Sequence, residues 1–271
     1  MNSPANFPTK TERLEFALRS GTLGDVAGIL AEMSPGDVAH LISSSPPDYR
    51  AVLLGLLEPE HEVLVVNELP DELRNALLAD RGPEALAEIV EQLDDDDVAD
   101  ILHELPDEVT SQVLAIMDEQ YRQRIQKVLS FSDDVAGGLM STDTITIRAD
   151  LTLDVVLRYL RRHKELPRNT DSLIVVNRDD RFVGLLAIGT VLVSDPAVSV
   201  REMMITDQEA IAADTSATEV ARRFERNDWI SAPVVDDDGK LLGRITIDDV
   251  VDVIREEADH SLTSLAGLAE E

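Results

Sequence analysis

The sequence contains no cysteine, so disulfide bonds and thiolate metal sites are excluded. Aromatic residues make up only 3% of the chain, which leaves few side chains that could stack on nucleic-acid bases. Basic residues are also scarce, with 24 against 54 acidic residues and a formal net charge of −30. A phosphate backbone repels such a chain. Nucleic acid is therefore not an expected partner, and cations or basic surfaces are.

Long hydrophobic runs are absent as well. The longest uncharged stretch, residues 182–194, has 13 residues, fewer than the roughly 18 that span a bilayer. The chain as given is therefore not expected to cross a membrane. The five histidines are scattered, and no pair of carboxylates is singled out by apolar surroundings that would tune a pKa. The sequence thus indicates no catalytic arrangement, and we do not expect an enzyme.

Residues 1–135 have apolar positions at helical spacing, as at Val98, Ile101 and Leu102. The segment Glu-Leu-Pro-Asp-Glu at 68–72 recurs at 104–108. Proline suits the first position of a helix, and acidic residues suit its positive N-terminus. The pattern predicts stacked helical hairpins, a short solenoid, with an irregular helical domain as the alternative.

From about residue 140, short apolar strands alternate with helices, and the order repeats after 59 residues. The expected strands are 173–176, 182–186, 232–235 and 241–245, and the expected helices are 151–162, 216–227 and one from about 248. The segment 131–141 is expected to be a connector, in which Gly137 and Gly138 allow backbone angles that other residues avoid.

A strand, an Asp-rich turn, a strand ending in Gly-x-Ile-Thr-x-x-Asp and a helix together resemble a CBS domain, and two in tandem resemble a CBS pair. With the acidic helical domain, the junction 136–140 and the end 246–257, nearly the whole chain resembles the cytosolic half of the MgtE magnesium transporter family. The expected fold class is α plus α/β, with an α-helical superhelical repeat domain before the tandem CBS pair and a short C-terminal helix. The expected domains are 1–135 (helical repeats), 139–200 (first CBS), 201–258 (second CBS) and 259–271 (start of the connecting, plug helix).

Acidic residues form two clusters. In the first, Asp94 to Asp97 are followed by Asp100, and Asp96 and Asp100 share a helical face. One Asp satisfies a helix cap, so four favour a Mg²⁺ site, because Mg²⁺ binds one or two carboxylates and keeps several waters. The second cluster is a stripe on the last CBS helix, expected opposite an apolar face: its acids are Asp249, Asp252, Glu256 and Asp259, and the apolar residues are Val250, Val251 and Ile254. The alternative for this stripe is the solvated face of an amphipathic helix.

The resemblance implies that Asp96 and Asp100 form the family's metal-binding Asp-x-x-x-Asp motif and that several Mg²⁺ ions bind. It assigns further metal contacts to Asp249, Asp252, Glu257 and Asp228, and to Glu62 through an insertion. This chain departs from the family's carboxylates at Ser216, Thr218 and His260, so fewer ions are expected.

CBS pairs often bind adenine nucleotides, with a Ser or Thr on the phosphate and the motif Asp on the ribose. The second motif keeps Thr246 and Asp249, and Trp229 could stack on a base or simply pack. The first motif, with which the family's ATP site is associated, has Ala187 and Thr190 at these places. The substitutions argue against ATP.

The resemblance implies the magnesium-sensing regulatory region of a magnesium transporter or channel, on the cytoplasmic side of the membrane. Mg²⁺ would bridge acidic residues of the helical-repeat and CBS domains and favour a compact, pore-closed homodimer attached to a membrane pore domain. The alternative is a stand-alone CBS regulatory protein that senses an adenine nucleotide and binds a partner protein.

Overall fold

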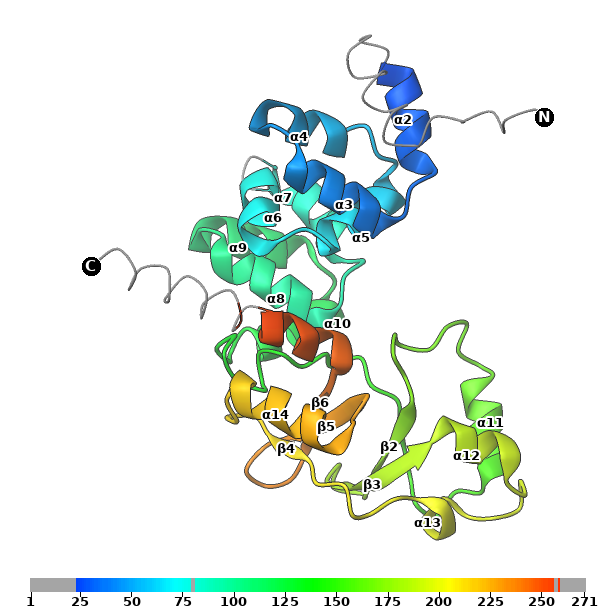
Figure 1. The fold of residues 1–271 in the computed structure, drawn as a ribbon. Helices are drawn as coiled ribbons and strands as arrows, with labels where there is room; N and C mark the ends of the chain where they lie inside the picture. The colour runs from blue at the N-terminus through cyan, green and yellow to red at the C-terminus, as the bar shows by residue number, and fades with distance from the viewer. Residues whose placement is uncertain (1–22, 79–80, 256–257, 259–271) are drawn as a thin grey trace, which may run out of the picture. The chain divides into compact units, whose positions relative to one another are not determined.

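The computed structural model describes residues 23–78, 81–255 and 258 (Figure 1). These residues form two compact units, and the division runs through helix α8 (Asp95–Glu104). The first unit contains the residues up to Leu93 together with Ile101–Asp118, and the second contains Asp94–Asp100 and the residues from Glu119 onward. The expected boundaries of the individual domains remain a proposal.

The regular structure described in the first unit is helical (Figure 1). Proline occupies the first turn of four helices, where its missing N–H costs no hydrogen bond. α3 packs against α4 and α5, and α7 packs against α9. The helices are α2 (Leu23–Ala31), α3 (Pro35–Ser44), α4 (Pro47–Leu54), α5 (Pro59–Asn67), α6 (Asp71–Leu78), α7 (Pro83–Val90) and α9 (Asp107–Ile116).

Both copies of the Leu-Pro-Asp-Glu repeat begin a helix, α6 at Asp71 and α9 at Asp107. We expected the proline in the first helical position, but Pro106 is the N-cap of α9, one residue before the helix. Its φ of −58° and ψ of 139° are extended-type angles, which an N-cap residue needs and a helical residue does not have. The repeat therefore marks helix starts, one residue later than predicted.

The second unit contains two three-stranded sheets of the same topology. In each sheet the first strand is parallel to the second, and the second is antiparallel to the third. The strands are β1 (Thr146–Ile147), β2 (Ser172–Val176) and β3 (Phe182–Ala187) in one sheet, and β4 (Ile211–Ala212), β5 (Ser231–Val235) and β6 (Leu241–Thr246) in the other. The expected α plus α/β class, with helices before two similar sheets, is confirmed.

The hairpin turns of the two sheets have the same internal hydrogen bonds. The Asn177 side-chain oxygen accepts from the main-chain N–H groups of Asp179 and Arg181 (2.9 and 3.0 Å). Asp236 Oδ1 does the same for Asp238 and Lys240 (3.0 and 2.9 Å). The 59-residue repeat in the sequence is thus a repeat of backbone geometry.

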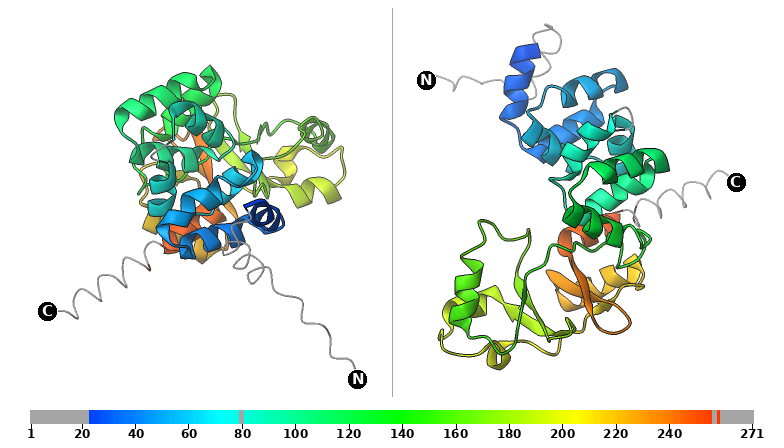
Figure 2. Two further views of the ribbon diagram at one scale, coloured as in Figure 1. Left: turned by 90° about the horizontal axis from the view of Figure 1, so that it is seen from above. Right: turned by 180° about the vertical axis from the view of Figure 1, so that it is seen from behind.

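Helices cover the two sheets (Figure 2). α11 (Leu153–Leu160) and α12 (Ile188–Val193) pack on the first sheet through a core that includes Val156 and Val191. α14 (Ala217–Asn227) and the helical residues 247–255 pack on the second through Phe224 and Val250. The other helices of the unit are α10 (Glu119–Val128) and α13 (Val200–Met203), and the expected helix 259–271 lies outside the described residues.

The connector 131–141 is tightly packed, which explains its glycines. A Cβ on Gly137 would lie 2.3 Å from the Phe131 ring, and one on Gly138 would lie 2.4 Å from the Ser132 carbonyl oxygen. Neither glycine has a positive φ, so the backbone angles that glycine allows are not the reason for their presence. These positions exclude a side chain because neighbouring atoms approach closely.

Candidate metal site

The first turn of α8 carries the aspartate run, and it is not a solvated turn. The side chains of Asp95 and Asp96 are only 2% and 7% exposed, and Asp94 and Asp97 are half-buried. Carboxylates are rarely buried unless they are paired or hydrogen-bonded. Residues 94–100 belong to the second unit. The role of each aspartate therefore depends on the side chains of that unit that surround it.

Asp95 is an anchor. Its Oδ2 accepts hydrogen bonds from the main-chain N–H of Thr142, at 3.0 Å, and from the Thr142 hydroxyl group. Its Oδ1 lies 3.5 Å from Nη2 of Arg124 on α10. Because both of its oxygens have partners, Asp95 holds the start of α8 in place. Its role is therefore structural.

Asp96 lacks such partners at one oxygen. Its Oδ1 is buried without a hydrogen bond, which costs free energy in the absence of a ligand. Burial raises the pKa of Asp96 well above its usual value, and the nearby carboxylates of Asp249 and Asp97 raise it further. Asp96 is therefore a buried acceptor facing other acids.

Asp249 is the acid whose charge acts most strongly on Asp96. Burial raises the pKa of Asp249 to about 7, and the negative charge of Asp248 adds to the shift. Asp249 Oδ2 accepts from the Thr246 main-chain N–H at 2.9 Å and from the Thr246 hydroxyl at 3.2 Å. Two neighbouring carboxylates repel each other when both are ionised, so the pair favours a bound proton or a cation between its oxygens.

A divalent cation can take the place of that proton. Mg²⁺ prefers oxygen ligands, retains waters and needs only one or two carboxylates. Within residues 23–78 and 81–255, no three acidic or histidine side chains converge as a ready metal-ligand group. The Asp96–Asp249 pair thus fits an ion that keeps part of its water shell and does not fit a fully protein-ligated one.

The second unit contains three other described residues that were predicted to bind metal, Asp100, Asp228 and Asp252. Asp100 is half-buried one helical turn beyond Asp96 on α8. Asp252 is exposed, with Oδ1 accepting from Arg255 at 3.1 Å. Asp228 is exposed at the end of α14, where its φ of 53° and ψ of 41° give a left-handed helix cap. The structure therefore brings together Asp96 and Asp249, whereas Asp228 and Asp252 are exposed.

The helix after β6 does not have the acidic and apolar faces that we predicted. Asp249 is partly buried while Asp252 is exposed, and Val251 and Ile254 are 38% and 46% exposed. The buried apolar residues of this helix are Val250 and Val253. The reason is local, because the bonds from Thr246 hold Asp249 against the end of β6 and so turn Val251 outward.

Two predicted residues lie elsewhere. Glu62, on α5 of the first unit, forms an ion pair with Arg81, and its side chain is 14% exposed. A cation at Glu62 would have to compete with that arginine. Glu257 lies outside the described residues, as do Glu256, Asp259 and His260.

The candidate nucleotide residues are engaged in the protein. The hydroxyl group of Thr246 donates to Asp248 and Asp249. The Trp229 ring packs edge-to-face on Phe224, with 5.7 Å between ring centroids, as part of the core of the second sheet. In the first motif, Ala187 is the N-cap of α12 and has no side-chain capping bond. The packing alternative is the one that the geometry of Trp229 favours.

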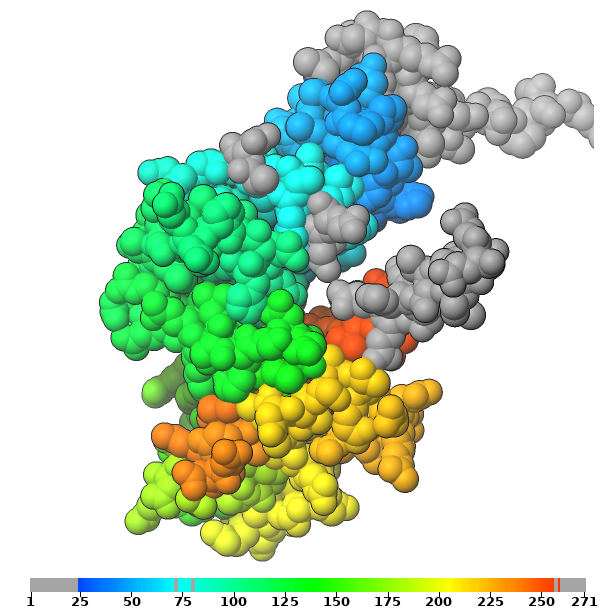
Figure 3. Space-filling view, turned by 90° about the vertical axis from the view of Figure 1, so that its left-hand side faces the viewer, coloured from blue at the N-terminus to red at the C-terminus, as the bar shows by residue number. Residues whose placement is uncertain are grey.

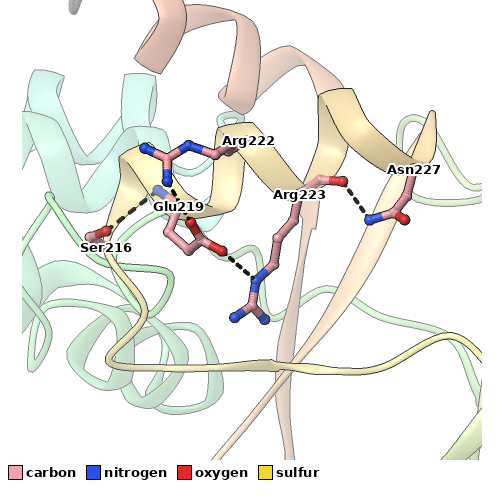
Figure 4. Close-up of polar contacts among 5 residues, drawn as sticks. All are labelled: Ser216, Glu219, Arg222, Arg223 and Asn227. Atoms are coloured by element: carbon pink, nitrogen blue, oxygen red, sulfur yellow. Dashed lines mark hydrogen bonds and ion pairs between the residues drawn. The ribbon is translucent and has the colours of Figure 1, made fainter.

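Helix α14 begins with a hydroxyl cap at Ser216, one of the positions where the sequence departs from the expected carboxylates (Figure 4). The Ser216 side-chain oxygen accepts from the Glu219 N–H at 3.4 Å. Glu219 in turn pairs with Arg222 and Arg223 at 3.1 and 3.2 Å. The Glu219 carboxylate is thus already paired with two arginines. The yellow to orange surface in Figure 3 belongs to this part of the second unit.

One charged residue of the site, Arg244, was not expected from the sequence. It is 6% exposed on β6, in a strand where apolar residues are expected. Its guanidinium donates to the main-chain carbonyl oxygens of Arg168 and Asn169. An arginine inside an otherwise apolar strand was the signal available in the sequence, because a buried cation needs partners from elsewhere in the fold.

No helix in the part of the chain that the structure describes is both long and apolar enough to cross a bilayer.

Residues 33–134 match the family profile of the MgtE intracellular N domain, and residues 134–194 and 200–256 match that of the CBS domain. The magnesium transporter MgtE of Thermus thermophilus is 33% identical over 153 residues, which are 56% of this chain and 34% of that protein. MgtE of Bacillus subtilis is 28% identical over the same shares, so the chain spans about a third of the length of these curated relatives.

Solved structures extend the match over most of the chain. The cytosolic domain of the Mg²⁺ channel MgtE, determined in complex with ATP, is 31% identical with a TM-score of 0.82, over 90% of this chain and all of that domain. The soluble part of a magnesium transporter, at 21% identity and a TM-score of 0.77 over 92% of this chain and all of that one, shares the fold. With an MgtE N domain followed by two CBS domains, the chain belongs to the MgtE family.

Proposed function

We propose that the chain is the magnesium-sensing regulatory part of a magnesium transporter or channel and acts on the cytoplasmic side of the membrane. Mg²⁺ binds between Asp96 of the MgtE N segment and Asp249 of the CBS segment. The observation that carries the proposal is the buried, unpartnered Oδ1 of Asp96 beside the carboxyl of Asp249. The magnesium transport named for the relatives supports the choice of ion.

The proposed mechanism is a population shift. Without a divalent ion, the Asp96–Asp249 pair must keep a proton or suffer repulsion, so its contact is weakened. Mg²⁺ binds best when both carboxylates face it, and it therefore stabilises the compact state by its difference in affinity between the two states. We further propose that this state is a pore-closed homodimer joined to a membrane pore domain, and that Asp100, Asp228, Asp252, Glu257 and Glu62 supply additional contacts to several ions. The role proposed for this region is regulatory and not catalytic.

The test is a magnesium titration of the chain at constant ionic strength. We expect millimolar Mg²⁺ to lower the radius of gyration measured by small-angle X-ray scattering, because bridging favours the compact state. The control replaces Mg²⁺ by Na⁺ at the same ionic strength and should leave the radius of gyration unchanged. A radius that does not respond to Mg²⁺ contradicts the proposed function.

The proposed homodimer uses apolar side chains that the second unit leaves exposed. Leu192 and Val193 on α12 are 68% and 85% exposed, and Val251 and Ile254 are exposed on the helix that follows β6. Val250 on the same helix is 1% exposed and belongs to the core. Exposed apolar residues of this kind often mark protein interfaces.

We expect sedimentation velocity to show a dimer at tens of micromolar chain. Val193→Glu combined with Ile254→Glu should yield a monomer, since it places charges in an apolar contact. The matched control is Ile116→Glu in the first unit, where the side chain is 46% exposed, and it should remain dimeric. A monomeric wild-type chain contradicts the proposed homodimer.

A stand-alone CBS regulator that senses an adenine nucleotide is the second candidate. Its support is the structural relative that was determined with ATP. Against it, the first motif has Ala187 and Thr190 in place of phosphate and ribose ligands, and Thr246 is bonded to aspartates. We therefore propose weak or absent ATP binding, and a micromolar dissociation constant by calorimetry would favour this second candidate.

A further inference from the structure

Two arginines lie at the acidic site, and one of them is a fixed buried cation. The guanidinium of Arg244 donates from Nη1 to the Asn169 carbonyl oxygen at 3.2 Å and from Nη2 to the Arg168 carbonyl oxygen. Arginine stays protonated at neutral pH, so the positive charge is permanent. The hydrogen bonds of Arg244 go to neutral carbonyl groups, which do not neutralise its charge. The positive charge therefore attracts the acidic side chains nearby.

The acids around Arg244 are those of the candidate site and its borders. Asp171, Asp94, Asp143 and Asp249 all interact electrostatically with its guanidinium. At Asp94, burial raises the pKa of the carboxyl, while the charge of Arg168 and then that of Arg244 lower it. Asp94, the first residue of the aspartate run, therefore lies in the field of two arginines as well as in that of neighbouring carboxylates.

Arg168 is held in this place through its main chain. Besides the bonds from Arg244, Asn169 Nδ2 donates to Asp248 Oδ2 at 2.7 Å, and the Ser231 hydroxyl donates to Asp171 Oδ1 at 2.6 Å. Arg168 itself is exposed. Its side chain can therefore be removed without opening a cavity, and the segment that carries it stays tied to the second CBS motif.

We propose that Arg168 and Arg244 are internal counter-ions of the acidic cluster around Asp94 and Asp249, and that Arg168 sets the Mg²⁺ concentration at which this cluster binds the ion. The proposal rests on the proposed function, because it assumes that Mg²⁺ binds at Asp96 and Asp249. A tethered positive charge lowers the attraction that the same carboxylates exert on a divalent cation. The two arginines thus weaken Mg²⁺ binding without being displaced as ligands.

The test is Arg168→Gln in the full chain, compared with Arg162→Gln. Arg162 is exposed in the same basic segment, so the control changes the net charge equally. The readout is the gain in Tm with increasing Mg²⁺ at constant ionic strength, followed by the fluorescence of Trp229, the single tryptophan, which packs in the core of the second sheet. Unlike the Tm itself, the Mg²⁺-induced gain does not change when a substitution merely destabilises the fold.

We expect Arg168→Gln to lower the Mg²⁺ midpoint several-fold, since the bound divalent ion loses a nearby repulsive charge. Arg162→Gln should leave the midpoint unchanged. In the background of Asp94→Asn the effect of Arg168→Gln should shrink, because the two side chains act on each other. These three results together would support the proposed counter-ion role of Arg168.

The contrary outcomes are distinct. If wild type gains no Tm with Mg²⁺, the proposed function is wrong and the counter-ion falls with it. If wild type responds and Asp96→Asn removes the response, but Arg168→Gln leaves the midpoint unchanged or raises it, the proposed function stands and the counter-ion is wrong. An equal decrease in the midpoint for Arg162→Gln also overturns the counter-ion, since only the net charge would then matter.

Discussion

Replacing Asp96 with Asn and Asp100 with Ala should raise the Mg²⁺ midpoint for compaction about tenfold or more. Each replacement removes a carboxylate from the same face of α8, and a hard divalent ion depends on carboxylate charge for its affinity. The fold should survive, because the asparagine at 96 has the shape of the aspartate and removes a charge that burial and Asp249 disfavour. Without Mg²⁺ the variant should be more stable than wild type, by on the order of 1 kcal/mol.

The matched control is Asp207→Asn with Glu209→Gln. Both side chains are exposed in the second unit, and the pair changes the net charge by the same amount. The radius of gyration and the Tm of the second unit, read from Trp229, are measured for both variants across a Mg²⁺ titration. If both variants shift the midpoint alike, Mg²⁺ only screens a net charge of −30, and no site exists at Asp96.

In Mg²⁺-free buffer, the second unit should lose stability as the pH rises from 5 to 8. Burial raises the pKa of Asp249 to about 7, whereas the unfolded chain has the ordinary value near 3.8. Between these values the folded state binds more protons than the unfolded state, so the free energy of unfolding falls as the pH rises. The contribution is present below pH 4 and is lost through pH 7, with a slope of at most about 1.4 kcal/mol per pH unit.

The measurement is urea unfolding followed by Trp229 fluorescence at several pH values, with and without Mg²⁺. Asp249→Asn should flatten the pH dependence and should unfold at higher urea than wild type at pH 8. Asp207→Asn, an exposed change of the same charge, should keep the wild-type slope. Saturating Mg²⁺ should restore the stability of wild type at pH 8, because the ion replaces the proton between Asp96 and Asp249. A wild-type slope in Asp249→Asn would mean that other acids cause the pH dependence.

Local patterns in the sequence determined the architecture. Apolar spacing and proline-led helix starts predicted the helical region, and the 59-residue repeat predicted two similar sheets, down to matching turns at Asn177 and Asp236. These features depend on residues within a few positions of one another, which a single sequence displays directly. The run from Asp94 to Asp97 was likewise recognisable as more acidic than a helix cap requires.

Only the tertiary structure decided what each acid does. Asp95 is bonded to Thr142 and lies near Arg124, whereas Asp96 next to it is buried with a free oxygen against Asp249. Helical periodicity placed Asp249 and Asp252 on one solvated stripe, but the bonds from Thr246 buried one and left the other exposed. Arg168 and Arg244 reach the site from segments that no local pattern connects to it. Burial and charge at a site come from residues far apart in the chain, and these are the quantities that set pKa values and cation affinity.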